Sequence, residues 1–249
     1  ADTERSLLLT STQESEDQVY DEGSDPELEC NGGHYTRKFA FLQVTFRLPF
    51  DGPVHIIAVV YGFLPIVVPA TFLVHWLIRR HFLGLYGFCV SIAVSFVNEL
   101  ILKGLLNDPR PKESANKYRD PKDGRMKMTK GMPSGHSLNA TTIMVWAGME
   151  VACRGPGFHE HILQTLEWLL FIVVLMAPVP WARWRNKDHT LEQCLAAVPL
   201  GLLAGAAAYI VRSRCFHSSW RPWLAPGDTH VLTVGGPSVH IAGLTAEAT

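Results

Sequence analysis

The run PVHIIAVVYGFLPIVVPATFLVHWLI, residues 53–78, decides the fold class of this chain. Its 26 residues include no Asp, Glu, Lys or Arg, and a helix needs roughly 20 predominantly apolar residues to cross a bilayer. Pro65 and Pro69 interrupt the run, but membrane helices tolerate proline better than helices of soluble proteins do. The run therefore predicts a transmembrane helix that ends at Arg79 and Arg80.

Four more apolar runs follow the first one, and each contains one acidic residue and no Lys or Arg. Helices of a soluble bundle would show a polar face, and these runs have almost none. We therefore expect an all-α fold, a polytopic membrane helix bundle of about five transmembrane helices over residues 53–215. The four runs are residues 82–102, 137–153, 162–182 and 190–211.

The segments on either side of this domain differ from it in composition. Residues 1–30 contain ten acidic residues and one Arg, a charge of −9, which leaves about +8 on the rest of a chain whose net charge is −1. We expect residues 1–33 to be disordered or draped over a partner, and residues 216–249 to form an irregular tail. Residues 34–52 are aromatic and basic, which predicts a segment at the membrane interface or against a partner protein. The basic remainder suits an anionic substrate or anionic membrane lipids, and nothing indicates a nucleic-acid partner.

Three short polar strings stand at the ends of the apolar runs. If each run crosses the membrane once, runs two and four end on the face where runs three and five begin. The three strings therefore share one face, where they predict a polar site rimmed by the charged loop of residues 107–130. They are Lys103-x6-Arg110-Pro111, Pro133-Ser134-Gly135-His136 and Arg183-x5-His189.

The residue types in these strings suit the binding and transfer of a phosphoryl group. Lys103, Arg110 and Arg183 can meet three non-bridging phosphate oxygens with charge-assisted hydrogen bonds, and phosphoryl transfer is catalysed mainly by such positioning and charge stabilisation. Backbone N–H groups around Ser134 and Gly135, where the third helix starts, would add an anion-binding helix terminus. We expect no metal ion and no other cofactor, because the chemistry needs none and no cysteine has metal-ligand spacing.

Two histidines complete the predicted site. Gln193 lies four residues after His189 on the same helix face, where its carbonyl oxygen can accept from Nδ1–H and leave Nε2 free to attack phosphorus. His189 is therefore the predicted nucleophile, and His136 is the predicted general acid for the leaving oxygen. Glu99 lies four residues before Lys103, and we expect it to hold that lysine in place.

The three strings, in this order, resemble the three signatures of the type 2 phosphatidic acid phosphatase superfamily, whose members are related to vanadium haloperoxidases. The resemblance covers roughly residues 53–215. It implies an integral membrane enzyme that hydrolyses a lipid phosphate or diphosphate, without a metal ion, through a phosphohistidine intermediate.

Two residues depart from the third signature, which usually has a Ser before its Arg and an acid four residues after its His. Ala182 and Gln193 stand at these positions. The His-Thr-x-x-Gln ending, together with Asn98-Glu99 and Asp108-Pro109-Arg110-Pro111, resembles the dolichyl-diphosphatase branch. That resemblance makes a polyprenyl or dolichyl diphosphate the leading substrate and the endoplasmic reticulum the favoured membrane, with a plastid or mitochondrial membrane left open.

Two other functions stay open on the sequence. A neutral Gln stabilises an imidazolium less than a carboxylate does, so the chain also fits a catalytically weak or silent homologue that serves as a structural subunit of a larger membrane complex. Residues 1–52 and 216–249 would then dock the partners, and a pocket plugged by side chains or by a partner would favour this reading. Vanadate-dependent oxidation in the same anion site is the third alternative, with only the shared site in its favour.

Overall fold

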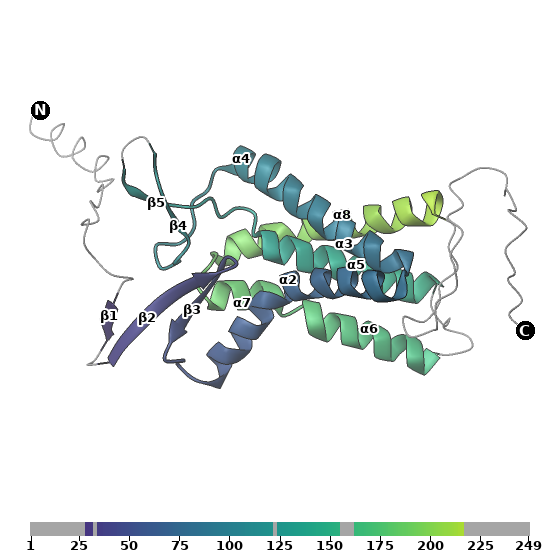
Figure 1. The fold of residues 1–249 in the computed structure, drawn as a ribbon, viewed down its shortest axis with the longest axis horizontal. Helices are drawn as coiled ribbons and strands as arrows, with labels where there is room; N and C mark the ends of the chain where they lie inside the picture. Colours follow the sequence, from purple (N-terminus) through teal and green to yellow (C-terminus); the bar gives the residue numbers. More distant parts are fainter. Residues whose placement is uncertain (1–27, 32–33, 122–123, 155–161, 217–249) are drawn as a thin grey trace, which may run out of the picture.

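The computed structural model describes residues 28–31, 34–121, 124–154 and 162–216. The predictions made for residues 1–27 and for the tail beyond residue 216 lie outside these described residues. Long helices form a bundle, and two small β-sheets lie at one end of it (Figure 1).

Helices occupy all five apolar runs, which confirms the predicted helical membrane fold. In lipid every backbone polar group must be paired within its own segment, and an α-helix achieves this for an uninterrupted apolar run. The helical elements are α2 (Pro53–Arg79), α3 (Phe82–Val97), the π-helical segment η1 (Asn98–Leu102), α4 (Lys103–Leu106), α5 (Gly135–Arg154), α6 (Ile162–Met176), α7 (Val179–Arg185) and α8 (Leu191–Cys215).

Four helical units of the described chain are long and apolar enough to cross a membrane, one fewer than predicted. Their large apolar side chains often face outward, as Leu105 (76% exposed) and Leu203 (70% exposed) do. Such a surface matches the hydrocarbon of a bilayer, so the chain is an integral membrane protein. The units are Pro53–Arg79, Phe82–Leu106, Ile162–Arg185 and Leu191–Cys215.

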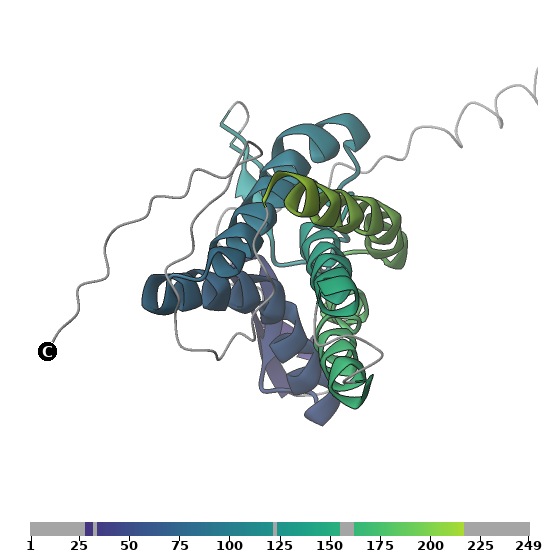
Figure 2. The same cartoon turned by 90° about the vertical axis from the view of Figure 1, so that its right-hand side faces the viewer.

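The remaining run forms α5, which is more polar because it lies inside the bundle. It contacts α2, α3, α6, α7 and α8 (Figure 2). Thr141 and Thr142 are buried in it, and each donates its hydroxyl to a backbone carbonyl four residues earlier, so these groups are satisfied without water. A helix surrounded by other helices need not be as apolar as one that faces lipid.

Two glycines let α8 pack closely against α5. A Cβ at Gly201 would lie 2.6 Å from Cβ of Thr141, and a Cβ at Gly205 would lie 2.7 Å from the carbonyl oxygen of Thr142. Small residues at this spacing allow membrane helices to approach each other. The two helices run in the same direction, so both begin at the end of the bundle that holds the β-sheets (Figure 1).

The segment before α2, for which the sequence predicted no regular structure, forms strands. β1 (Leu28–Asn31), β2 (His34–Phe41) and β3 (Val44–Leu48) make an antiparallel sheet in the order β1-β2-β3. Aromatic and β-branched residues favour strands through cross-strand pairing, and Phe39 stacks on Phe46 with ring centroids 5.6 Å apart.

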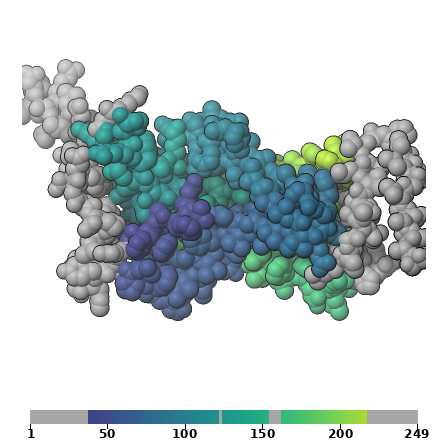
Figure 3. All heavy atoms as spheres, viewed as in Figure 1, coloured from purple at the N-terminus to yellow at the C-terminus, as the bar shows by residue number. Residues whose placement is uncertain are grey.

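The loop between α4 and α5 adds a second hairpin, from β4 (Lys117–Arg119) and β5 (Met126–Met128). Figure 3 shows the β2–β3 hairpin, in purple, next to this teal loop. Hydrogen bonds join them, and among these the backbone N–H of Ala115 and the side-chain amide of Asn116 both donate to Oγ1 of Thr45, each at 3.3 Å. Residues 34–48 therefore cover one end of their own helical bundle.

Candidate active site

All three polar strings lie at the end of the bundle where α4 and α7 end and α5 and α8 begin (Figure 1). The three predicted phosphate-binding cations are buried there, with exposed fractions of 4% for Lys103, 4% for Arg110 and 0% for Arg183. Lys103 begins α4, Arg110 lies in the following loop and Arg183 is in α7. The count of membrane crossings therefore predicted correctly that distant parts of the chain meet at one end.

Lys103 is held by Glu99, as the spacing of the two residues predicts. Its Nζ lies 2.5 Å from Oε1 of Glu99, and the pair belongs to the π-helical turn that joins α3 to α4. Gly135 lies against the same turn, where a Cβ would come within 2.9 Å of Nδ2 of Asn98. Glycine is therefore needed at position 135 because α5 begins in close contact with η1.

The two predicted catalytic histidines share one electrostatic environment. His136, half-buried in the first turn of α5, and His189, buried between α7 and α8, lie outside the four candidate spans. Burial, followed by the positive charges of the same three cations, lowers the pKa of each imidazole well below its usual value. Both rings are therefore neutral in the free protein, as an attacking nitrogen must be.

Gln193 makes the contact that was predicted for it. Its Oε1 lies 3.1 Å from Nδ1 of His189. Its Nε2 donates to Oδ2 of Asp108 at 2.5 Å and to the carbonyl of Pro109 at 2.8 Å, which fixes the orientation of the amide. Asp108 therefore places a carboxylate on the far side of the Gln193 amide from His189, although the residue four positions after His189 is not itself an acid.

Thr190 and Gln193 form a capping box at the start of α8. The hydroxyl of Thr190 accepts from the backbone N–H of Gln193, and Oε1 of Gln193 accepts from the backbone N–H of Thr190, both at 3.2 Å. This reciprocal cap satisfies two of the unpaired donors at the helix terminus. It also fixes the backbone next to His189, so the start of α8 helps to hold the imidazole in position.

The backbone N–H of Ser134, at the predicted anion-binding helix start, already has a partner within the protein. That N–H donates to the carbonyl of Gln193 at 3.1 Å, and the side chain is fully buried with its hydroxyl oxygen accepting from Ser137 at 3.0 Å. Ser134 therefore joins the start of α5 to the start of α8, and its amide is already used.

An ion pair that the sequence analysis missed holds Arg183. Asp188 lies 2.9 Å from it, and both side chains are fully buried. Burial raises the pKa of Asp188, while Arg183 acts in the opposite direction. The backbone N–H of Thr45 donates to Oδ1 of Asp188 at 2.8 Å, so this carboxylate also anchors the β2–β3 hairpin.

Arg110 has a different kind of partner. Burial, followed by the neighbouring charge of Arg183, lowers the pKa of Arg110 to about 10. Its NH2 donates to Oε1 of Gln43 at 3.0 Å, and Nε and NH1 have no hydrogen-bond partner in the described part of the chain. Nε2 of His136 also has no hydrogen-bond partner among the described residues. Buried donors without partners are rare, and they are what an anion-binding site must offer.

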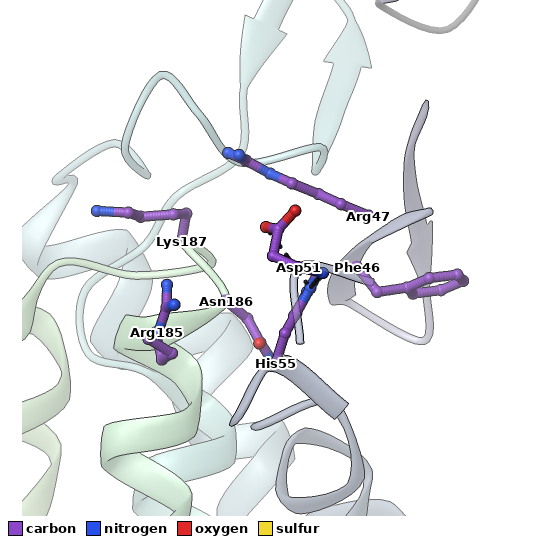
Figure 4. Close-up of a pocket in the computed structure, with 7 residues that line it drawn as sticks. All are labelled: Phe46, Arg47, Asp51, His55, Arg185, Asn186 and Lys187. Atoms are coloured by element: carbon purple, nitrogen blue, oxygen red, sulfur yellow. Dashed lines mark hydrogen bonds and ion pairs between the residues drawn. The ribbon is translucent and has the colours of Figure 1, made fainter. Parts of the chain in front are cut away.

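A separate pocket opens at the same end of the molecule. Figure 4 shows Asp51 between Arg47 and His55, with His55 Nδ1 accepting from the backbone N–H of Asp51 at 3.4 Å. Exposed Arg185 and Lys187 lie on the opposite wall. None of the predicted catalytic residues lines this pocket. It is lined by Phe46, Arg47, Asp51, His55, Arg185, Asn186 and Lys187.

Sequence reasoning missed Gln43, Asp108 and Asp188 as parts of the site. Asp188 adjoins the predicted nucleophile, and Asp108 lies within the first string, so position in the sequence could have drawn attention to both. Gln43 carries no such signal, because its segment precedes the helical domain and reads as interfacial. Only the folded hairpin places it beside Arg110.

Comparison with known proteins agrees with the motif assignment. A family model described as the PAP2 superfamily matches residues 84–217, more than half of the 249 residues, and this range includes all three strings. Neither a search of curated proteins nor a search of solved structures found a match.

Proposed function

The chain belongs to the PAP2 superfamily, and from this premise we propose that it hydrolyses a lipid phosphate or diphosphate without a metal ion, through a phosphohistidine. The observation that carries the proposal is the convergence of three buried cations and two neutral imidazoles at one end of the bundle. A phosphate group would supply the negative charge that this cluster of cations attracts.

The proposed reaction has two steps. Nε2 of His189 attacks phosphorus while the bond from phosphorus to the leaving oxygen breaks, and His136 gives its proton to that oxygen. Water then attacks the phosphohistidine, gives a proton to His136 and releases phosphate. Substrate binding prepares the acid, because the charge of a bound phosphate offsets the three cations that lower the pKa of His136.

Gln193 and Asp108 are the proposed orienting residues. The amide oxygen of Gln193 keeps the proton of His189 on Nδ1, which leaves Nε2 unprotonated for attack. Asp108 accepts from the other end of the same amide, so its charge polarises the glutamine toward the imidazole that becomes positive during the reaction. The pair supports an active enzyme in spite of the missing acid at position 193.

A polyprenyl diphosphate such as dolichyl diphosphate is the proposed substrate, and the endoplasmic reticulum the proposed membrane, on the resemblance of the His-Thr-x-x-Gln ending and the Asp108-containing string. The exposed apolar helix surfaces support lateral entry of the lipid tail from the bilayer. A panel assay with dolichyl diphosphate, phosphatidic acid and a sphingoid phosphate would rank the candidate substrates.

His189→Ala is the direct test of the mechanism. The variant should lose phosphate release by at least about 10⁴-fold and should trap no phosphoenzyme, because the attacking nitrogen is gone. His55→Ala removes a histidine from the neighbouring pocket at the same end of the bundle and should retain full turnover. Full activity of the His189→Ala variant would refute the proposed nucleophile.

The second candidate function is a silent structural subunit of a membrane complex. Two sequence departures, Ala182 and Gln193, favour it, and so does the β2–β3 hairpin that lies across the site. This candidate predicts no phosphate release by the purified wild-type chain on any substrate of the panel, together with co-purification of partner subunits from its native membrane.

A further inference from the structure

The tip of the β2–β3 hairpin consists of Leu42 and Gln43, and it lies among the residues proposed to bind phosphate. The φ angles of the two residues are 48° and 64°. Two-residue hairpin loops require this left-handed region, but Asn-Gly adopts it far more easily than Leu-Gln does. The turn is therefore strained, and the contacts that it makes must offset that strain.

Oxygen atoms of the tip accept the hydrogen bonds that a phosphate would be expected to accept. NH2 of Arg183 donates to the carbonyl of Gln43 at 2.6 Å, and NH2 of Arg110 donates to Oε1 of the same residue at 3.0 Å. The imidazole of His136 makes a hydrogen bond to the backbone of Leu42. One neutral turn thus engages three of the cationic or acidic groups assigned to the reaction.

Few other contacts hold Leu42 and Gln43 themselves, whereas the next two residues, Val44 and Thr45, are buried (0% and 2% exposed) and anchor the strand beside the tip. Nδ2 of Asn116 donates to the carbonyl of Gln43 at 3.3 Å, and the backbone N–H of Thr45 donates to Asp188 at 2.8 Å. The side chains of Phe41 and Leu42 are 60% and 51% exposed. Withdrawal of Leu42 and Gln43, with the buried Val44 left in place, would therefore lose little apolar burial, and a charged phosphate would replace the lost hydrogen bonds with stronger ones.

We propose that the tip of the β2–β3 hairpin is an internal occupant of the phosphate subsite, which the phosphate of a lipid substrate must displace before it can reach His189. This inference rests on the proposed phosphatase function and adds an autoinhibitory contact to it. The apparent affinity for substrate is then the intrinsic affinity multiplied by the fraction of molecules in which the tip has withdrawn.

Binding of orthovanadate, a phosphate-like anion, to the full chain in detergent micelles tests the proposal by calorimetry. Gln43→Ala removes the acceptor of Arg110, and Asn116→Ala loosens the tip without changing a cation or a histidine. Each variant should bind vanadate about tenfold more tightly than the wild type, because one hydrogen bond of the competing tip is gone. Lys127→Ala changes an exposed ion pair on β5 and should bind like the wild type.

A second measurement needs no variant. Amide hydrogen exchange of the wild-type chain, read over residues 39–48, should become faster when vanadate binds, because withdrawal of the tip loosens the adjoining backbone and weakens the hydrogen bond from the N–H of Thr45 to Asp188. Exchange over residues 126–128 serves as the internal control and should not change. This measurement keeps the proposal testable even if a variant fails to fold.

The possible outcomes distinguish failure of the proposed role of the tip from failure of the proposed phosphate site. Vanadate binding with unchanged exchange over residues 39–48, or with wild-type affinity in both variants, would overturn the proposed role of the tip and leave the phosphate site intact. Weaker binding by Gln43→Ala would overturn it too, because Gln43 would then belong to the binding site. If vanadate bound to neither the wild type nor the variants, the phosphate site itself would fail.

Discussion

Arg212 and Arg110 are buried arginines at opposite ends of the helical bundle, and they are compensated differently. At the end away from the site, Nε of Arg212 lies 3.1 Å from Oε1 of Glu150, and the side chains are 1% and 3% exposed. At the site end, Arg110 is also buried, yet no carboxylate of the described chain lies within 4 Å of it, and it donates to the neutral amide of Gln43.

The difference distinguishes a charge that is paired within the protein from a charge that is left to pair with a ligand. An ion pair inside a helix bundle is matched within the protein, and the loss of one partner leaves a buried charge uncompensated. A buried guanidinium that faces a neutral oxygen is poorly compensated already, so it lowers stability until an anion arrives. The comparison therefore supports a structural role for Arg212 and the proposed ligand-binding role for Arg110.

The largest expected effect is on the structural pair. Arg212→Met should lower the free energy of unfolding by about 3–5 kcal/mol, because Glu150 would remain buried without its counter-charge. Unfolding in mixed detergent micelles would measure the change. The double variant Arg212→Met/Glu150→Leu should recover most of the loss, and equal destabilisation of the single and double variants would mean that the pair is not what the arginine stabilises.

Arg110→Met should have the opposite profile. We expect kcat/KM to fall about 10²–10³-fold, the usual cost of removing one transition-state donor, while the free energy of unfolding stays the same or rises. Arg119→Met is the matched control on the same loop, since Arg119 donates to the carbonyl of Gly124 at 2.9 Å on the exposed hairpin. A stability loss as large as that of Arg212→Met would show that Arg110 stabilises the fold in the way that Arg212 does.

The smallest expected effect concerns the residue that departs from the family signature. Gln193→Glu places a second carboxylate against Asp108, and repulsion between the two should make one of them hold a proton. We expect kcat/KM to fall roughly tenfold, the equivalent of about one pKa unit. Gln193→Glu/Asp108→Asn should restore activity, because an amide at position 108 can donate to the new carboxylate. Equal activity of the two variants would show that Asp108 does not act through Gln193.

Much of the fold and site followed from the sequence because the signals were local or obeyed simple topology. Apolar runs specify membrane helices wherever they occur, and the count of crossings placed the three strings at one end. The contacts from Gln193 to His189 and from Glu99 to Lys103 join residues only four positions apart, so both could be predicted from spacing, although His189 lies just before α8 and not within it as predicted. The exception among the runs was α5, because its polarity reflects protein neighbours that no single run can reveal.

The sequence by itself determined that this chain is a helical membrane protein and which charged residues gather at one end of it. Only the tertiary structure decided which of those charges are matched. Gln43 lies 67 residues from Arg110 and 140 from Arg183 along the chain, Asp108 lies 85 residues from Gln193, and Asp188 meets Arg183 through the turn that follows α7. Such pairings depend on how the loops and the β2–β3 hairpin pack over the helix ends, and that packing leaves no periodic pattern in the sequence.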